Sequence, residues 1–537
     1  MSAATAARAM FGRRGHRPPG PPAWLVASGA LVALLGLIPI AYLVVLAASA
    51  DASVLDLALR DRTLGVLWRT VALAATVTAA SALIAVPLAW LTVRTDLPGR
   101  RAWSVLTVLP LVIPSYVGGY AFVAALGPRG ALQSLLEPLG VERLPELYGF
   151  GGAALALTLF SFPYVLLGAR GALQRLDPAY EEAARSLGRG AWRTFWTVTL
   201  PQLRPAIAAG CLLVALYALS DFGAVSLMQF DSFTRAIYVQ YRASFDRTLA
   251  AVLALMLVAL TAVILIAEAR VRGRARYHRS GAGAPRPHRV VRLGAWRWPA
   301  LGVCAAVVGL SVAVPLGTIG YWLARGVSAG EPINLVLDAT LNSILASGLA
   351  ALLAVAAAVP VAVLAVRHPR ALGATIERAT YAGFALPGIV IGLAFVFVGA
   401  TWTPWIYQTL PLLVIAYLVR FVPQAVGTTR ASLLQVSPRL EEAARMLGRR
   451  PAAVLREVTI PIMRPGLVAG GALVFLTAMK ELPTTILLAP TGFDTLAVRI
   501  WSATSEGFFA RAAAPALLMV GVAAISLVVL LRQERNA

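Results

Sequence analysis

The sequence has 537 residues, of which 59% are hydrophobic and only 13% are charged, whereas a soluble protein carries about a quarter charged residues. Its formal net charge is +23, but the basic residues gather in segments that separate long uncharged runs. The composition therefore excludes an ordinary soluble domain and predicts an integral membrane protein in contact with the lipid bilayer, with no nucleic-acid partner.

Charge-free runs of membrane-spanning size follow one another along the chain, since about twenty apolar helical residues cross the hydrocarbon core. They are residues 24–50, 71–93, 102–128, 147–169, 248–267, 298–324, 339–366 and 512–531. The run 379–419 is long enough for two crossings, with a turn predicted at 399–407, and the shorter runs 205–220 and 465–479 each end at or just before an acidic residue. The sequence therefore predicts about twelve transmembrane helices, six in each half.

Basic residues indicate the orientation of these spans. The run that begins after Pro22 is longer than a signal-peptide core, so we expect a retained first span. With the N-terminus in the cytoplasm, the cytoplasmic segments hold most of the 47 lysines and arginines, as the positive-inside rule requires. Both termini are then cytoplasmic.

The predicted domains follow from this count. A basic cytoplasmic tail (1–23) precedes a first transmembrane bundle (24–269), and a second bundle (298–531) precedes a short cytoplasmic tail (532–537). The connector 270–297 is rich in arginine, contains glycine and proline and has no acidic residue, which is typical of a flexible cytoplasmic linker.

The two halves are repeats of each other. Residues 178–210 and 438–470 are identical at about half of their positions at a constant offset of 260, and Asp221 falls on Glu481 in the same register. Upstream the offset is 273, which pairs Arg94 with Arg367, so the first half is longer, most plausibly in the outer loop 128–150. Six spans in each half predict parallel repeats about an axis normal to the membrane.

The repeated segment is polar and lies on the cytoplasmic side, between the fourth and fifth spans of each half. A proline suits the first turn of a helix, where the dipole also favours carboxylates, and a glycine can end a helix in the left-handed conformation. We expect a helix, a turn and a second helix that ends near Pro201 or Pro461, and we call each copy a knuckle. The residues that define the knuckles are Glu181, Glu182, Ala183, Ala184, Gly188 and Pro201, and Glu441, Glu442, Ala443, Ala444, Gly448 and Pro461.

Both knuckles resemble the EAA loop of type I ABC importer permeases, in which E-A-A is followed by three residues, a glycine and then I/L-P. The likeness covers about 66–269 and 339–531. It implies the type I transmembrane fold twice over, in a bacterial inner membrane. It also implies that the knuckles couple transport to two copies of an ATP-binding cassette ATPase, and that an extracytoplasmic substrate-binding protein delivers the cargo.

The chain itself cannot hold a Walker A motif, because that motif needs a lysine after glycine and the sole lysine, Lys480, follows Met479. We therefore expect no catalytic residue, no metal site and no bound cofactor here, with ATP and Mg used by the partner ATPase. A secondary transporter would also show repeats, but would more often carry acids in mid-span.

The substrate is less sharply indicated. Residues 219–241 and 480–517 resemble the fused permeases of ferric-iron importers, which implies ferric iron as the expected substrate. Related permeases serve thiamine and phosphonate importers, so these or another small solute are the alternatives. Asp221, Lys480 and Glu481 follow the two shorter runs and fall near the outer side of the membrane. These charges either line a translocation path or gate, or are interfacial charges that pair with an arginine such as Arg235.

Overall fold

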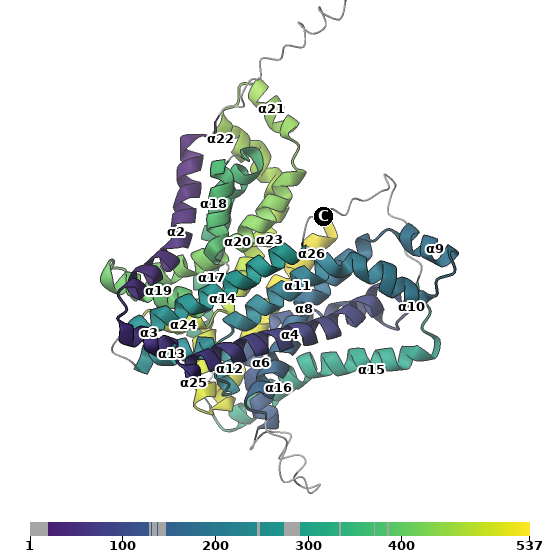
Figure 1. The fold of residues 1–537 in the computed structure, drawn as a ribbon, viewed down its shortest axis with the longest axis horizontal. Helices are drawn as coiled ribbons and strands as arrows, with labels where there is room; N and C mark the ends of the chain where they lie inside the picture. Colours follow the sequence, from purple (N-terminus) through teal and green to yellow (C-terminus); the bar gives the residue numbers. More distant parts are fainter. Residues whose placement is uncertain are drawn as a thin grey trace, which may run out of the picture.

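The computed structural model describes residues 20–536 except 128–129, 131–136, 138–146, 244–246, 273–289, 332–334, 370 and 384–385. Most of the predicted N-terminal tail, linker and outer loop 128–150 therefore lie outside the described residues. Within the described part, helices account for the architecture, and the β-pairing is a single bridge between Thr95 and Val291. The prediction of an all-α membrane protein is confirmed (Figure 1).

Ten helices in the described part of the chain are long and apolar enough to cross a membrane, or eleven when one bent pair is counted as a span. In several of these spans, the long helix is continuous with one or more shorter helical segments. The helices at their centre are α2 (Ala23–Ala48), α4 (Asp61–Arg94), α8 (Phe150–Arg175), α11 (Leu200–Ser220), α14 (Thr248–Arg272), α15 (Arg297–Val308) with α16 (Val314–Ser328), α17 (Leu335–Arg367), α20 (Leu410–Gln435), α23 (Ile460–Met479) and α26 (Phe509–Asn536).

The third span of each half is broken, which the sequence did not predict. In the first half, α5 (Arg100–Leu106) and the 3₁₀ turn η1 (Leu109–Val112) meet α6 (Ser115–Leu126) at 95°. In the second half, α18 (Ala371–Ala382) is separate from α19 (Gly388–Thr401), which is shorter than a full crossing. Pro114 and Pro387 cap α6 and α19, and a residue before or at a proline readily leaves the helical conformation.

The first span of each half packs on the opposite half. Helix α2 contacts α17, α18 and α19 of the second half as well as α14, and α16 contacts α6 of the first half as well as α26. The Tyr42 hydroxyl lies 3.2 Å from the Thr401 hydroxyl, and the Trp322 indole donates to the Ala124 carbonyl at 3.4 Å. Each half thus covers the third span of the other, and the two repeats interlock.

The remaining spans form a similar group in each half. Helix α4 packs against α8 and α11, and α17 packs against α20 and α23. Short helices follow the fifth spans: α12 (Gly223–Leu227) and α13 (Phe233–Ala243) after α11, and α24 (Pro483–Leu488) and α25 (Leu496–Ser505) after α23. The predicted domain boundaries remain predictions, since the interlocking leaves no separable bundle to test them.

Candidate functional site

Each knuckle folds as the repeat predicts over its first helix and turn. Helix α9 (Pro178–Ser186) begins at a proline, and Asp177 accepts a hydrogen bond from the Ala179 amide at 3.0 Å. Helix α21 (Pro438–Met446) also begins at a proline, but its N-cap residue Ser437 makes no capping hydrogen bond through its side chain. Gly188 and Gly448 both adopt a φ of +79°, the left-handed conformation that favours glycine. Figure 1 shows α9 and α21 at two separate corners of the molecule.

The second helix of each knuckle does not end at its proline, which corrects the predicted break near Pro201 and Pro461. Helix α10 (Ala191–Thr194) passes through a π-helical turn η3 (Phe195–Thr199) directly into α11. The second half repeats this with α22 (Pro451–Val454), η7 (Leu455–Thr459) and α23. A π turn pairs residues five apart, and this wider turn admits a proline without ending the helix.

The outer surface of each knuckle is exposed and partly apolar. Glu182, Glu442, Ala183 and Ala443 are all exposed. At the tips, Leu187 is 80% exposed, Met446 91% and Leu447 84%, and Trp192 is also exposed. Large apolar side chains grouped on a surface usually mark a contact with another protein, so these tips are candidate docking surfaces.

The first glutamate of each pair points inward instead. Glu181 lies 3.4 Å from the Arg94 guanidinium and accepts from the Thr199 hydroxyl at 2.8 Å. Glu441 accepts from Arg367 at 3.0 Å and from the Thr459 hydroxyl at 3.1 Å. The sequence reasoning did not assign roles to these arginines and threonines, although the repeat offsets that pair them were visible.

A central cavity of about 740 Å³ lies between the halves, and all three predicted path residues line it. It extends from the C-terminal ends of α11 and α23 to Gln435, the last residue of α20. Most of its lining is apolar. The charged and larger polar side chains in the lining include Tyr116, Tyr164, Tyr217, Asp221, Arg420, Gln424, Gln435, Lys480 and Glu481.

The two carboxylates in the cavity wall cap the short helices that follow the fifth spans. Asp221 accepts from the Ala224 and Val225 amides at 3.0 and 3.2 Å, and from the Ser115 hydroxyl. Glu481 accepts from the Thr484 amide at 3.1 Å and from its hydroxyl at 2.7 Å. Both side chains are buried, and their hydrogen bonds hold α12 and α24 in place at the end of the cavity where α11 and α23 end.

Glu481 also forms a salt bridge that Asp221 lacks in the described structure. Arg420 on α20 lies 2.7 Å from Glu481, whereas Arg235, the arginine suggested by the sequence, pairs with Asp231 at 2.9 Å. The Arg420 side chain passes over Gly388, where a Cβ would overlap it. In the first half, Ser115 occupies the position equivalent to Gly388. Its hydroxyl donates a hydrogen bond to the Asp221 carboxylate, where the second half has the arginine.

Lys480 bridges the two halves at the end of the cavity. Its ammonium donates to the Leu111 carbonyl at 2.7 Å, and Leu111 belongs to the 3₁₀ turn at the break in the first half's third span. Ser220 occupies the equivalent position in the first half and donates to its own helix, to the Tyr217 carbonyl at 3.0 Å. The contact between halves is therefore one-sided.

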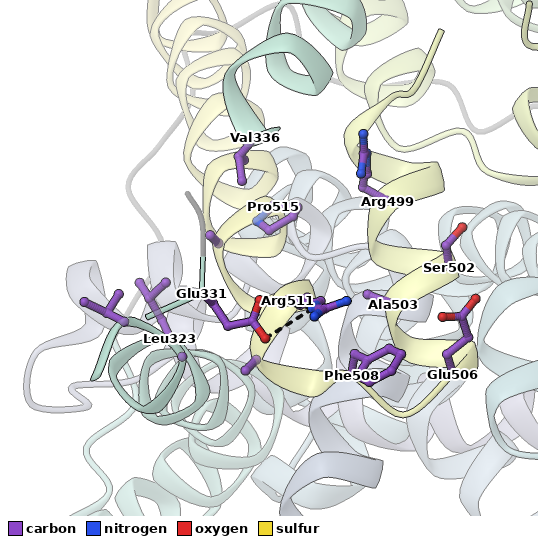
Figure 2. A pocket seen from close by; sticks show the side chains of 14 residues that line it. Leu323, Glu331, Val336, Arg499, Ser502, Ala503, Glu506, Phe508, Arg511 and Pro515 are labelled. Carbon is purple, nitrogen blue, oxygen red and sulfur yellow. Dashed lines mark hydrogen bonds and ion pairs between the residues drawn. The ribbon is translucent and has the colours of Figure 1, made fainter. Parts of the chain in front are cut away.

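A smaller cavity of about 360 Å³ lies between α16, α25 and α26, apart from the central one. Figure 2 shows Arg511 and Glu331 pointing toward each other across it, at 3.0 Å. The Arg511 guanidinium also stacks over Phe508, 4.8 Å from the ring centroid. These contacts fasten the segment after the first span of the second half to the start of its last span.

In the described residues, no group of three or more histidine, cysteine, aspartate or glutamate side chains could hold a metal ion. Asp221 and Glu481 each accept backbone hydrogen bonds at the start of a short helix.

Comparisons with known proteins agree with this geometry. A family model described as "Binding-protein-dependent transport system inner membrane component" matches residues 81–277 and again residues 335–535. The Fe(3+)-transport system permease protein FbpB 2 of Haemophilus influenzae is 35% identical over 508 residues, which cover 94% of this chain and 97% of that protein.

More distant relatives cover less. The ferric transport system permease protein FbpB of Actinobacillus pleuropneumoniae is 24% identical over 441 residues, 78% of this chain and 64% of that protein. The molybdenum transport system permease protein ModB of Escherichia coli is 36% identical over 162 residues, 29% of this chain and 69% of that protein.

Proposed function

Because the chain belongs to the family of inner membrane components of binding-protein-dependent transport systems, matched once in each half, we propose that it imports ferric iron as the fused permease of an ABC importer. It is a multi-pass membrane protein and a translocation subunit. The assignment of ferric iron as the substrate rests on 35% sequence identity to a named Fe(3+) permease along nearly the whole of both chains.

Two ATPase subunits supply the energy in this proposal, one at each knuckle. The two knuckles share the same fold, the same exposed Glu182 or Glu442 and an apolar tip, which supports equivalent docking of two identical partners. The chain has one lysine and no Walker A motif, so ATP and Mg are used by the partner, and this subunit has no catalytic residue of its own.

The cargo enters from the opposite side. With both termini in the cytoplasm, the knuckles are cytoplasmic and the helices α12, α13, α24 and α25 lie on the outer side, where an extracytoplasmic binding protein docks. This orientation in the bacterial inner membrane rests on the excess of basic residues in the segments that share the knuckles' side.

In this proposal the central cavity is the translocation path, and its outer end is closed. At its outer end Gly223 packs against Tyr116 and Leu482, side chains of both halves, and the Lys480 contact to Leu111 adds a polar bridge there. Toward the cytoplasm the lining continues to Gln435. Alternating access then requires the two fifth spans to separate at their outer ends.

The test is import by the full transporter in proteoliposomes, with the ATPase and binding protein that co-purify with this chain. We expect iron to accumulate only with ATP on the ATPase side, and the purified binding protein to carry iron. Accumulation driven by an ion gradient without ATP would contradict the importer and favour a secondary transporter.

The same preparation separates the substrate alternatives. Relatives that match one half of the chain include molybdenum permeases, and the sequence also allows thiamine, phosphonate or another small solute. If the co-purified binding protein carries one of these and iron does not compete with it for import, the iron assignment is wrong while the importer assignment stands.

A further inference from the structure

In the second half, one buried carboxylate joins the knuckle to a membrane span that is not its neighbour in sequence. Arg367, the last residue of α17, donates to Glu441 through two nitrogens, at 3.2 and 3.0 Å. The Thr459 hydroxyl donates to the same oxygen at 3.1 Å. The Glu441 side chain is only 8% exposed, so this contact is shielded from water and salt.

The first half repeats the arrangement at equivalent positions. Arg94, the last residue of α4, lies 3.4 Å from Glu181, and the Thr199 hydroxyl donates to Glu181 at 2.8 Å. Both arginines therefore end the second span, both glutamates lie in the first turn of a knuckle, and both threonines end a π-helical turn. The same three residue types meet in both halves, although Arg94 Nη2 reaches Glu181 as an ion pair without a hydrogen bond.

These contacts matter because of what lies between each knuckle and the fifth span. The chain passes from the knuckle into α11 or α23 through a π-helical turn, and such turns are rarer and less regular than α-helix. A push on the knuckle could therefore be absorbed by deformation of this turn. The contact from arginine to glutamate to threonine bypasses it, because it ties the knuckle to the second span and to the far end of the turn.

We propose that Arg94–Glu181–Thr199 and Arg367–Glu441–Thr459 are coupling clamps. This inference rests on the proposed coupling role of the knuckles. Each clamp makes its knuckle move as one body with the second and fifth spans, so that displacement by the ATPase reaches the cavity wall. The clamp residues are positioning residues: Glu182 and Glu442, next to them in sequence, face outward and contact the partner, while Glu181 and Glu441 transmit the movement inward.

The two clamps are not equally tight. Arg367 uses two nitrogens on Glu441 and also donates to the Val436 carbonyl at 2.9 Å. Arg94 makes the longer contact, and its backbone is held by the linker: the Val291 amide, near the end of the linker, donates to the Arg94 carbonyl at 2.8 Å. We therefore expect loss of the second-half clamp to have the larger effect.

The test is the number of ATP molecules hydrolysed per solute imported, measured with the full transporter in proteoliposomes. Glu441→Gln keeps the size of the side chain but removes its charge, and Thr459→Val removes only the hydroxyl donor. We expect each to raise this ratio, Glu441→Gln by roughly fivefold or more, the lower end of typical coupling between sites. Arg367→Lys keeps a charge and should fall between wild type and Glu441→Gln.

Glu377→Gln is the matched control for Glu181→Gln. Glu377 pairs with Arg430 at 3.4 Å and its side chain is 19% exposed, against 3.4 Å and 20% for Glu181, but it joins α18 to α20 and not to a knuckle. We expect Glu181→Gln to raise the ratio and Glu377→Gln to leave it unchanged.

Two results would overturn the clamps while leaving the proposed function intact. One is an unchanged ratio in both Glu441→Gln and Thr459→Val. The other is a parallel fall in import and hydrolysis, which would mean that the contact only supports folding. Import by the unmodified transporter without its ATPase would instead refute the proposed function. The result that refutes the clamps therefore differs from the result that refutes the importer.

Discussion

Gly388→Ala is expected to break the salt bridge in the wall of the cavity. A Cβ at this position would overlap the Arg420 guanidinium and lie 2.5 Å from Glu481 Oε1. The arginine can move, because it is the end of a flexible side chain, but it then leaves Glu481 without its partner at 2.7 Å. The Glu481 side chain is 6% exposed, and loss of one partner of a buried pair costs about 3–5 kcal/mol.

The effect can be measured as thermal unfolding of the purified chain in detergent, together with import. Gly427→Ala is the control, since its Cβ would meet only the Tyr381 hydroxyl at an ordinary 3.5 Å, and alanine favours helix by about 1 kcal/mol over glycine. We expect Gly388→Ala to lower the unfolding temperature and Gly427→Ala to keep or raise it.

A double-mutant cycle isolates the cause. In a chain that already carries Arg420→Ala and Glu481→Gln, the pair is absent, so Gly388→Ala should lose most of its cost. The same cost in both backgrounds, or no cost in either, would refute the reasoning that Arg420 occupies the space over Gly388 in order to reach Glu481.

Three further outcomes follow from the knuckles and the topology. Glu182→Lys combined with Glu442→Lys reverses the exposed charge near the start of both knuckles and should abolish import, while the chain still inserts normally into the membrane. Wild-type import by this variant would contradict the docking of the ATPase at the knuckles. Gly448→Ala forces a side chain into a φ of +79°, which costs about 1–2 kcal/mol, and should lower ATPase co-purification more than Gly317→Ala, whose Cβ meets no atom within 4 Å. In a chain without its two native cysteines, Ser53→Cys, exposed on α3 (Ala52–Ala58), should react with an impermeant thiol reagent from outside the cell; protection from outside would reverse the topology.

The repeat, the knuckles and the fold class could be predicted because they depend on local patterns. Uncharged runs marked the spans, and E-E-A-A with a glycine marked each knuckle. The break in the third spans was missed because runs 102–128 and 379–419 contain no charge at the bend, although Pro114 and Pro387 stood at it. The packing of α2 and α16 on the opposite halves could not be predicted from the sequence, because an apolar helix surface does not specify which other helix it contacts.

It was also not predictable which of the two adjacent glutamates in a knuckle faces inward and which is exposed. Neighbouring residues on a helix point about 100° apart, so Glu181 and Glu182 point in different directions, but only the position of Arg94 shows which of them faces inward. Arg420 was missed for a different reason. The repeat places Phe160 at the equivalent position in the first half, so no paired signal marked the arginine as a partner of Glu481.

The central claim is that two ATPase subunits dock at the two knuckles, and site-specific photo-crosslinking tests it most directly. A photo-reactive amino acid at Leu187 or Leu447, each at least 80% exposed at a knuckle tip, should cross-link to the ATPase in native membranes, with one ATPase at each position. The same group at Trp405, which is exposed between α19 and α20 and lies outside the cell in the proposed topology, should not. Cross-linking from Trp405, or none from either knuckle, would contradict the account.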